Sequence, residues 1–247
     1  MRSFYLTDPG KVRSHNEDSV TILNNDSGEY LLAVADGMGG HSAGEVASSI
    51  AINHISKMFK DNFLNMEKVQ AVNWLRDTVI EINDLIFDYA EKHPESKGMG
   101  TTLVVALVTK DYILFGNIGD SSGFVVKENK LRKVTYDHTL VNLLLRAGEI
   151  TEVQAKEHPK KNVLMKALGA NNPIDIDIFD CDMDITAILL CSDGLTSMLD
   201  NEQTEKVLFE HEITVEDKVI KLIRKSNNRG GVDNISIAYL EFTESGD

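Results

Sequence analysis

The stretch Ala33–Ala47, AVADGMGGHSAGEVA, predicts both a local fold and a site. It completes an apolar run that begins at Tyr30, is typical of a buried strand and ends abruptly at Asp36. Several glycines follow, and apolar residues take up helical spacing from about Ala43. A strand end holds a side chain rigidly, and glycines leave the main chain open to a ligand or hydrated ion. Two interpretations are open at this point: a site at Asp36, or a tight turn in which Asp36 caps the helix.

Composition and charge limit the classes of protein to which the chain can belong. Its 247 residues are 42% hydrophobic and 26% charged, which is ordinary for a globular protein. The net charge of −14 argues against nucleic acid as a partner, because binding to a phosphate backbone needs a basic face. The charge suits a carboxylate cleft that concentrates cations, although a solvated acidic surface explains it more simply.

Cysteine usage and hydropathy bear on the compartment. Cys181 and Cys191 lie in no metal-binding or CxxC spacing, and the apolar run around Cys191 predicts a buried free thiol. The N-terminus lacks the apolar segment of a signal peptide, and no apolar run approaches the roughly 20 residues that span a bilayer. We therefore expect a cytoplasmic protein without membrane insertion.

Hydrophobic periodicity predicts an irregular succession of strands and helices. The expected strands are 2–7, 18–24, 30–35, 102–109, 112–117, 123–127, 131–135, 174–179, 186–191 and 235–242. The expected helices are 43–59, 66–92, 139–147, 151–157, 202–210 and 214–227. Short turns between the strands of 102–135 indicate an antiparallel meander.

This order favours an α+β fold over a doubly wound parallel sheet, because strands and helices do not alternate regularly. Two antiparallel sheets facing each other, with helices outside, would bury strands that are apolar on both faces, such as 102–108 and 187–191. We expect one domain over residues 1–247, since no linker or repeat interrupts it, with a small helical subdomain inserted at about 138–170.

The aspartate at a strand end recurs along the chain. Asp120 and Asp193 each follow an apolar run, and Asp233 directly precedes one. A lone aspartate in such a place is usually a turn residue, but four of them near glycines are harder to explain in that way. Near the N-terminus, the sequence Arg13-Ser14-His15-Asn16-Glu17-Asp18 puts an arginine beside two further acids.

These residue types indicate phosphate chemistry. Converging carboxylates repel one another unless a cation lies between them. Oxygen donors without histidine or cysteine favour Mg²⁺ or Mn²⁺ over zinc, and the planar guanidinium of Arg13 suits a phosphate oxyanion. Carboxylates, two divalent ions and an arginine together predict phosphoryl transfer or phosphate hydrolysis. The glycine-rich stretch lacks the Gly-Lys-Ser/Thr ending of a nucleotide-binding loop, and no Gly-x-Ser-x-Gly elbow is present.

A set of motifs spread over nearly the whole chain resembles the metal-dependent PPM-type (type 2C) serine/threonine protein phosphatases. In the family's order, the motifs are Arg13–Asp18, Asp36-Gly37-Met38-Gly39-Gly40-His41, Gly98-Met99-Gly100-Thr101-Thr102, Gly119-Asp120-Ser121, Asp137-His138-Thr139, Ser192-Asp193-Gly194-Leu195 and Gly231-Val232-Asp233-Asn234. The short form resembles the bacterial single-domain branch that is paired with a Ser/Thr kinase.

The resemblance implies an αββα sandwich of two antiparallel sheets with a metal cleft at one edge. It implies hydrolysis of phosphoserine and phosphothreonine in proteins by a water that bridges two Mn²⁺ or Mg²⁺ ions, with a third ion bound more weakly. Phosphorylated proteins and a cognate Ser/Thr kinase are then the expected partners, and we expect a monomer.

By motif position, the resemblance assigns the core ion ligands. Asp36 would bridge the two ions, and the carbonyl of Gly37 would bind one of them. Asp193 and Asp233 would complete the shell of the first ion. Glu17 or Asp18 would hold water or metal at the second.

The resemblance also assigns residues around this core. Asp120 would bind the third ion together with Asp193, and Arg13 would bind the substrate phosphate. Residues 138–170 would form a mobile flap beside the cleft.

The chain departs from the family at two positions. Some relatives carry a histidine directly after the Asp-Gly pair, where this chain has Met38, so that His41 or a water on the metal becomes the candidate proton donor. His41 can equally be a loop residue that caps the following helix. The family usually has arginine after Gly-Asp-Ser, and here Ser122 takes its place, which removes a salt bridge or a substrate contact.

Two other functions compete with a protein phosphatase. A catalytically silent relative would bind phosphoproteins or a kinase, but the four core aspartates and Arg13 are all present. A hydrolase of small phosphate esters would share the same site and differ in its substrates.

Overall fold

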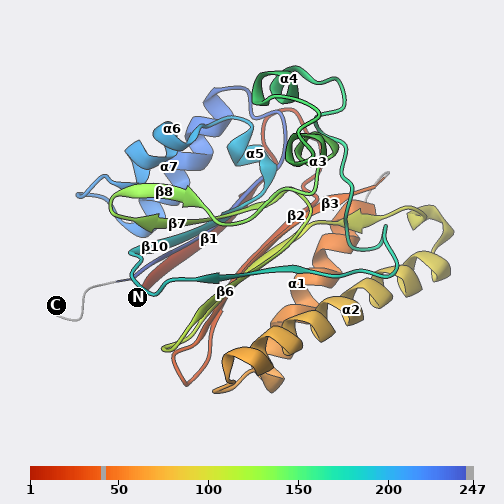
Figure 1. The fold of residues 1–247 in the computed structure, drawn as a ribbon, viewed down its shortest axis with the longest axis horizontal. Helices are drawn as coiled ribbons and strands as arrows, with labels where there is room; N and C mark the ends of the chain where they lie inside the picture. Colours follow the sequence, from red (N-terminus) through yellow and green to blue (C-terminus); the bar gives the residue numbers. More distant parts are fainter. Residues whose placement is uncertain (40–42, 243–247) are drawn as a thin grey trace.

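The computed structural model describes residues 1–39 and 43–242, whose strands form two antiparallel sheets packed face to face between helices (Figure 1). The first sheet has the order β1-β11-β10-β7-β8. Its strands are β1 (Arg2–Asp8), β7 (Ser122–Lys127), β8 (Lys130–Lys133), β10 (Ala187–Cys191) and β11 (Ile235–Glu241). The last strand of the chain pairs with the first along its whole length, so both ends of the sequence share one sheet.

The second sheet has the order β2-β3-β5-β6-β9. Its strands are β2 (Asp18–Asn24), β3 (Tyr30–Met38), β5 (Leu103–Val108), β6 (Ile113–Ile118) and β9 (Asp177–Cys181), and the short β4 (Gly100–Thr101) extends the pairing of β3. The predicted α+β sandwich of antiparallel sheets is confirmed.

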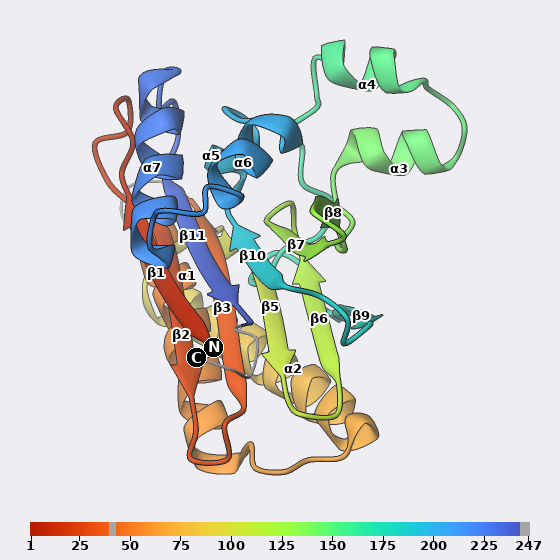
Figure 2. The same cartoon turned by 90° about the vertical axis from the view of Figure 1, so that its left-hand side faces the viewer.

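Helices cover the outer face of each sheet. The long helices α1 (Ala43–Asn62) and α2 (Lys68–Lys92) pack on the second sheet, and the 3-10 turn η1 (Pro94–Ser96) follows them. The helices α5 (Asp193–Thr196), α6 (Asn201–Leu208) and α7 (Val215–Asn228) pack on the first. The helices α3 (Leu140–Arg146) and α4 (Glu152–Glu157) stand away from both sheets (Figure 2).

The strands divide their side chains between separate cores, because successive residues of a strand point to opposite faces. In β3, Leu31 and Ala33 face α1 and α2, whereas Leu32 and Val34 face the other sheet. β5 and β10 alternate in the same way, which explains why their sequences are apolar throughout. The layer between the sheets contains Phe115, which is fully buried.

Two differences from the sequence prediction concern the strands. Strands β5 to β8 form no single meander, because the chain crosses from the second sheet to the first at Gly119, where φ is +101°. The strand expected over 174–179 lies instead at Asp177–Cys181. Ile174 and Ile176, which carry the apolar alternation, are buried in the core on the α1/α2 side just before that strand.

Two further predictions concern Cys191 and the membrane. Cys191 is a buried free thiol, as predicted, and burial raises its pKa to about 12. Within residues 1–39 and 43–242, no helix has the length and apolar character needed to cross a membrane.

The layer between the sheets should contribute much of the stability. We expect Phe115→Ala to lower the free energy of unfolding by about 3–5 kcal/mol, because it leaves a cavity where both sheets meet. Urea unfolding followed by circular dichroism measures this change. Val69→Ala on the exposed face of α2 is the control and should stay within about 0.5 kcal/mol of the wild type. A loss below about 1 kcal/mol for Phe115→Ala would show that the layer repacks freely.

Candidate active site

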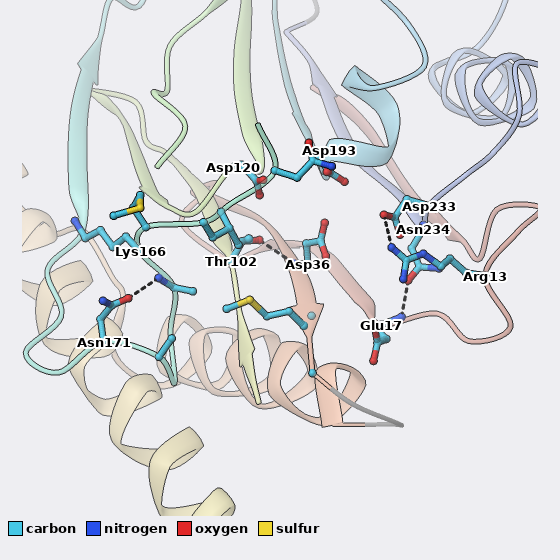
Figure 3. Close-up of a pocket in the computed structure, with 18 residues that line it drawn as sticks. Arg13, Glu17, Asp36, Thr102, Asp120, Lys166, Asn171, Asp193, Asp233 and Asn234 are labelled. Carbon is cyan, nitrogen blue, oxygen red and sulfur yellow. Dashed lines mark hydrogen bonds and ion pairs between the residues drawn. The ribbon is translucent and has the colours of Figure 1, made fainter. Parts of the chain in front are cut away.

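The candidate site lies at the edge of the sandwich where strands from both sheets begin and end (Figure 3). β3, β6 and β10 end at this edge, and β2, β7 and β11 begin there. Antiparallel pairing produces this arrangement, since each strand starts where its neighbour stops. The predicted acids stand at these junctions, and the fold therefore brings together residues from both ends of the sequence.

A cleft of about 570 Å³ opens at this edge. All but one of the predicted site residues that the structure describes line it: Arg13, Glu17, Asp36, Gly37, Asp120, Asp193 and Asp233. The exception is Asp18. The candidate proton donor His41 lies outside the described residues, and Met38, which directly follows the Asp-Gly pair, lines the cleft.

Asp36 is fixed by the hydrogen bonds of its own backbone. Its N–H donates to Thr102 Oγ1 at 2.9 Å, and its carbonyl oxygen accepts from the Thr102 N–H and the Thr101 hydroxyl at the same distance. The Thr102 hydroxyl also bonds the Ser121 hydroxyl at 2.7 Å, beside Asp120. The backbone is thus fully occupied, and the Asp36 carboxylate is left to point into the cleft (Figure 3).

Gly37 allows three segments to meet behind the cleft. Its N–H donates to the Glu17 carbonyl at 3.1 Å, and the Ser48 hydroxyl donates to the same carbonyl at 2.6 Å. A Cβ atom at Gly37 would lie 2.1 Å from the Gly44 carbonyl oxygen, inside any allowed contact. Only glycine therefore lets α1 begin directly against β3, with the Gly37 backbone facing the cleft.

Glu17 and Asp18 lie on different sides of the site. Glu17 lines the cleft, and its Oε1 is buried beside the Gly44 backbone, with no partner in hydrogen-bond geometry in the part of the chain that the structure describes. Asp18 stands opposite Asp36 in the β2–β3 register and is buried behind it, where it accepts a hydrogen bond from Ser192 Oγ at 2.7 Å. The second oxygen of Asp18 has no hydrogen-bond partner among the described residues. The sequence did not distinguish between Glu17 and Asp18 as the acid at the second ion, and in the structure Glu17 is the one that lines the cleft.

Desolvation and mutual repulsion make these acids hard to ionise together. Burial, followed by the charges of Asp193 and Asp137, raises the pKa of Asp120 to about 7. Burial and neighbouring carboxylates likewise raise the pKa values of Asp18, Asp36 and Asp193. Over the described residues, no three acidic, histidine or cysteine side chains form a ready-made cage for an ion. A cation entering the cleft would relieve the repulsion.

Arg13 enters the site as a partner of Asp233. Its Nη2 donates to Asp233 Oδ2 at 2.7 Å, and this hydrogen bond, opposed by partial burial, raises the pKa of Arg13. Half of the Arg13 side chain is exposed. The guanidinium can therefore present its remaining N–H donors to an anion in the cleft.

Asn234 positions the N-terminal loop that carries Arg13. Its side-chain amide donates to the carbonyls of Pro9 and His15 at 3.0 and 2.9 Å, and its Oδ1 accepts from the Glu17 N–H at 2.9 Å. Asn234 follows Asp233 in the motif Gly231-Val232-Asp233-Asn234, which by itself predicted no role for it. The position of Asn234 directly before a strand and next to the candidate ligand Asp233 is the sequence feature that could have pointed to this role.

The wall opposite Arg13 is formed by residues 162–171, which overlap the flap expected beside the cleft at 138–170, although no side chain of this segment was assigned to the site. Asn162, Lys166 and Asn171 line the cleft from this segment. Thr101 pairs with Leu168 in an isolated bridge that attaches the segment to the core. Its residue types are ordinary for a loop, so only the fold shows which of its side chains line the cleft.

Ser122 stands at the position where the resemblance leads one to expect an arginine, and a lysine from a neighbouring strand lies close to it. Ser122 is buried, with its hydroxyl 3.5 Å from Asp137 Oδ1. Lys133 from β8 donates to the same Asp137 oxygen at 2.6 Å. The chain thus has a cation beside Asp137, supplied by a neighbouring strand instead of by position 122.

Known protein phosphatases match this chain over nearly its whole length. The protein phosphatase 2C family matches residues 11–225. The serine/threonine phosphatase Stp of Listeria welshimeri is 40% identical over 98% of this chain and 96% of its own length. Protein phosphatase PhpP of Streptococcus pneumoniae is 33% identical over 97% of this chain and 96% of its own length.

Solved structures show the same architecture. The serine/threonine phosphatase of S. agalactiae superposes with a TM-score of 0.92 at 34% identity, covering 98% of this chain and 99% of that one. Stp1 of Staphylococcus aureus gives a TM-score of 0.91 at 34% identity, covering 98% of this chain and 95% of that one. The chain therefore belongs to the protein phosphatase 2C family and is a bacterial PPM-type serine/threonine phosphatase.

Proposed function

We propose that this phosphatase hydrolyses phosphoserine and phosphothreonine in proteins with the help of Mn²⁺ or Mg²⁺. The observation that carries the proposal is the meeting of Glu17, Asp36, Asp120, Asp193 and Asp233 with Arg13 in one cleft. The carboxylates supply hard oxygen donors for divalent ions, and the arginine supplies a partner for the phosphate.

The chemistry of the donor set fits such ions. The candidate donors are carboxylate oxygens and the Gly37 carbonyl, and the described lining residues include no cysteine and no histidine. Glu17 Oε1 is buried beside the Gly44 backbone and has no partner in hydrogen-bond geometry among residues 1–39 and 43–242, so it is available to a cation or its water. The raised pKa of Asp120 supports the same conclusion, because a nearby cation would favour its ionised form.

We assign the residues to ions in the following way. Asp36 would be a ligand of two ions, and the Gly37 carbonyl would bind one of them. Asp193 and Asp233 would complete the shell of the first ion and Glu17 would serve the second, while Asp18 would support Asp36 from behind. Asp120 and Asp193 would hold a third ion. When bound, such ions would lower the pKa of a water and so supply the nucleophile at neutral pH.

Arg13 would bind and orient the substrate. Its planar fork can hold two phosphate oxygens and stabilise the charge that develops on them. For this it must share or release Asp233, which an ion on Asp233 would favour by competing for the same carboxylate. Asn234 sets the reach of Arg13, since it anchors the loop on which Arg13 stands.

The leaving seryl or threonyl oxygen must receive a proton during the reaction. His41 remains our candidate donor within this proposal, as the histidine that the sequence brings nearest to Asp36.

We further propose that residues 138–170 act as a mobile flap of a single domain that spans residues 1–247. A second cavity of about 420 Å³ lies between this segment and the site, lined by Asn142, Glu152 and Lys161 together with Asp120 and Asp193. Those two aspartates therefore border both cavities. Flap movement would change the surroundings of the proposed third ion.

The cellular setting is also part of the proposal. A cytoplasmic monomer that reverses the action of a partner Ser/Thr kinase fits the bacterial branch of the family. Its substrates would be the phosphorylated proteins of that kinase.

Hydrolysis of a phosphothreonine peptide tests the proposal directly. EDTA-treated protein should release no phosphate, and Mn²⁺ or Mg²⁺ should restore release, because the acids alone offer no activated water. Malachite green detection of phosphate measures this, with p-nitrophenyl phosphate as a second substrate. Peptide binding without hydrolysis under either metal would support the silent module instead, and hydrolysis of p-nitrophenyl phosphate alone would support a small-ester hydrolase.

Asp193→Asn should separate metal binding from folding. We expect a loss of at least about 100-fold in kcat/KM, because the amide removes a charged ligand, and changes even in residues behind the ligands cost about 10–100-fold. Calorimetric titration with Mn²⁺ should show weakened binding, while circular dichroism stays unchanged. Asp182→Asn, at an exposed residue outside the cleft, is the matched control. Near-normal turnover of Asp193→Asn would refute our ligand assignment.

The stability of the metal-free protein should fall as pH rises. In the folded state the pKa of Asp120 is about 7, well above its unfolded value, so the folded state binds more protons between about pH 4 and pH 7. The free energy of unfolding therefore decreases across that window as the buried carboxylates ionise. Thermal unfolding in EDTA at about pH 5 and about pH 7.5 measures the change.

Two comparisons complete the pH experiment. Asp120→Asn should flatten the dependence, and Mn²⁺ should restore stability at the higher pH. Stability that rises with pH in EDTA for the wild type and the variant alike would contradict the repulsion that we describe.

A further inference from the structure

Two cations line the cleft, and they lie at opposite ends of it. Arg13 stands beside Asp233, while Lys166 stands on the far wall, with Asp36 and Asp120 between them (Figure 3). The other described charged residues that line the cleft are acidic. Phosphate binding uses Arg13 and leaves Lys166 without a role in the chemistry described so far.

Lys166 is oriented by a chain of hydrogen bonds. Its Nζ donates to Asp177 Oδ1 at 3.0 Å, and Asp177 Oδ2 lies 3.1 Å from His138 Nε2. His138 Nδ1 accepts from the Gly119 N–H at 3.0 Å, which assigns the proton of a neutral ring to Nε2 and makes it a donor to Asp177. Each oxygen of the Asp177 carboxylate thus has its own partner.

The backbone of His138 joins the two walls of the site. Its N–H donates to the Gly119 carbonyl at 2.9 Å, and its carbonyl accepts from the Met165 N–H at 2.8 Å. Gly119 precedes Asp120, and Met165 precedes Lys166. In this position of the proposed flap, these hydrogen bonds hold Lys166 at a defined place relative to a proposed metal ligand, where it can contact a bound substrate.

We propose that Lys166 selects phosphopeptides that carry an acidic side chain close to the phosphorylated residue. This inference rests on the proposed function and specifies its substrate class. A peptide whose phosphate lies between Arg13 and the carboxylates, and whose chain continues toward residues 162–171, passes Lys166. Arg13 and Lys166 would then hold the two negative groups of one substrate.

The ammonium of Lys166 is available for this contact. It has three N–H donors, of which Asp177 takes one. The side chain is 24% exposed and extends away from Asp36 and Asp120 toward Asp177 on β9 (Figure 3), so a substrate carboxylate would reach it at the outer end of the cleft. Asp177 then positions the Lys166 ammonium through this hydrogen bond and partly offsets its positive charge.

The charge of the rest of the molecule makes the selection local. The chain carries a net charge of −14, and acids surround the reaction centre, so an acidic side chain on the substrate is repelled at most positions. Beside Lys166 the ammonium offsets part of this repulsion. We therefore expect the preference at one or two peptide positions on one side of the phosphorylated residue.

A peptide scan with matched variants tests the inference. Phosphothreonine peptides that differ only by Glu or Gln at one position, scanned on both sides, give the Glu/Gln ratio of kcat/KM. For the wild type at low salt we expect a ratio of about 3–10 at the selected position, falling toward 1 as salt screens the contact.

Two substitutions should move this ratio in opposite directions. Lys166→Met keeps the aliphatic stem and should lower the ratio to about 1 or below. Asp177→Asn can still accept from His138 but no longer offsets the charge of Lys166, so it should raise the ratio. Lys68→Met is the matched control, because Lys68 pairs with Asp180 on the same strand β9, outside the cleft. Its ratio should equal that of the wild type.

The outcomes distinguish this inference from the proposed function. A Glu/Gln ratio of about 1 at all positions in the wild type, or an equal ratio in wild type and Lys166→Met, would overturn the role of Lys166 while metal-restored hydrolysis stands. If the Glu/Gln ratio fell equally in Lys166→Met and Asp177→Asn, Lys166 and Asp177 would have only a structural role. That result would also overturn the inference. Failure of every peptide to react with Mn²⁺ or Mg²⁺ would overturn the proposed function itself.

Discussion

The repulsion among buried carboxylates at one edge of the sandwich is the constraint on which this structure depends. Asp18 and Asp36 stand opposite each other on paired strands, and Asp120 and Asp193 approach from the other junctions. Desolvation and like charge raise their pKa values, so folding brings these groups together at a cost in free energy. The rest of the fold must hold them in place despite that cost.

Packing between and around the sheets provides the opposing stability. Strands such as β3, β5 and β10 are buried on both faces, and their backbone pairing leaves little freedom at their ends. The Asp36 backbone is held by Thr101 and Thr102, and Gly37 admits α1 at a distance that any side chain would block. The apolar packing of the sandwich can thus hold mutually repelling acids at one edge. Such a rigid support keeps the candidate ligands preorganised.

Hydrogen bonds and ion pairs around the cleft connect the residues proposed to bind metal with those proposed to bind the substrate. Arg13 neutralises Asp233 while remaining half exposed, so one ion pair connects the proposed phosphate contact with a proposed metal ligand. His138 connects the loop of Asp120 with the wall that carries Lys166. Lys133 and Asp137 pair beside Ser122, where relatives usually have an arginine. Substrate selection and ion binding therefore share neighbours and need not vary independently.

The sequence by itself determined the α+β class, most of the elements and the acids of the site, because strand ends followed by Asp and Gly are local patterns. Tertiary structure decided which acid faces the cleft, since Glu17 and Asp18 are neighbours in the chain and only the β2–β3 register turns Asp18 behind Asp36. It also decided that β6 and β7 belong to different sheets, because a turn at Gly119 has the same local signal in either case. Lys166 and Asn234 acquire their places only when residues 162–171 and the N-terminal loop close over the edge, through contacts between residues far apart in the sequence.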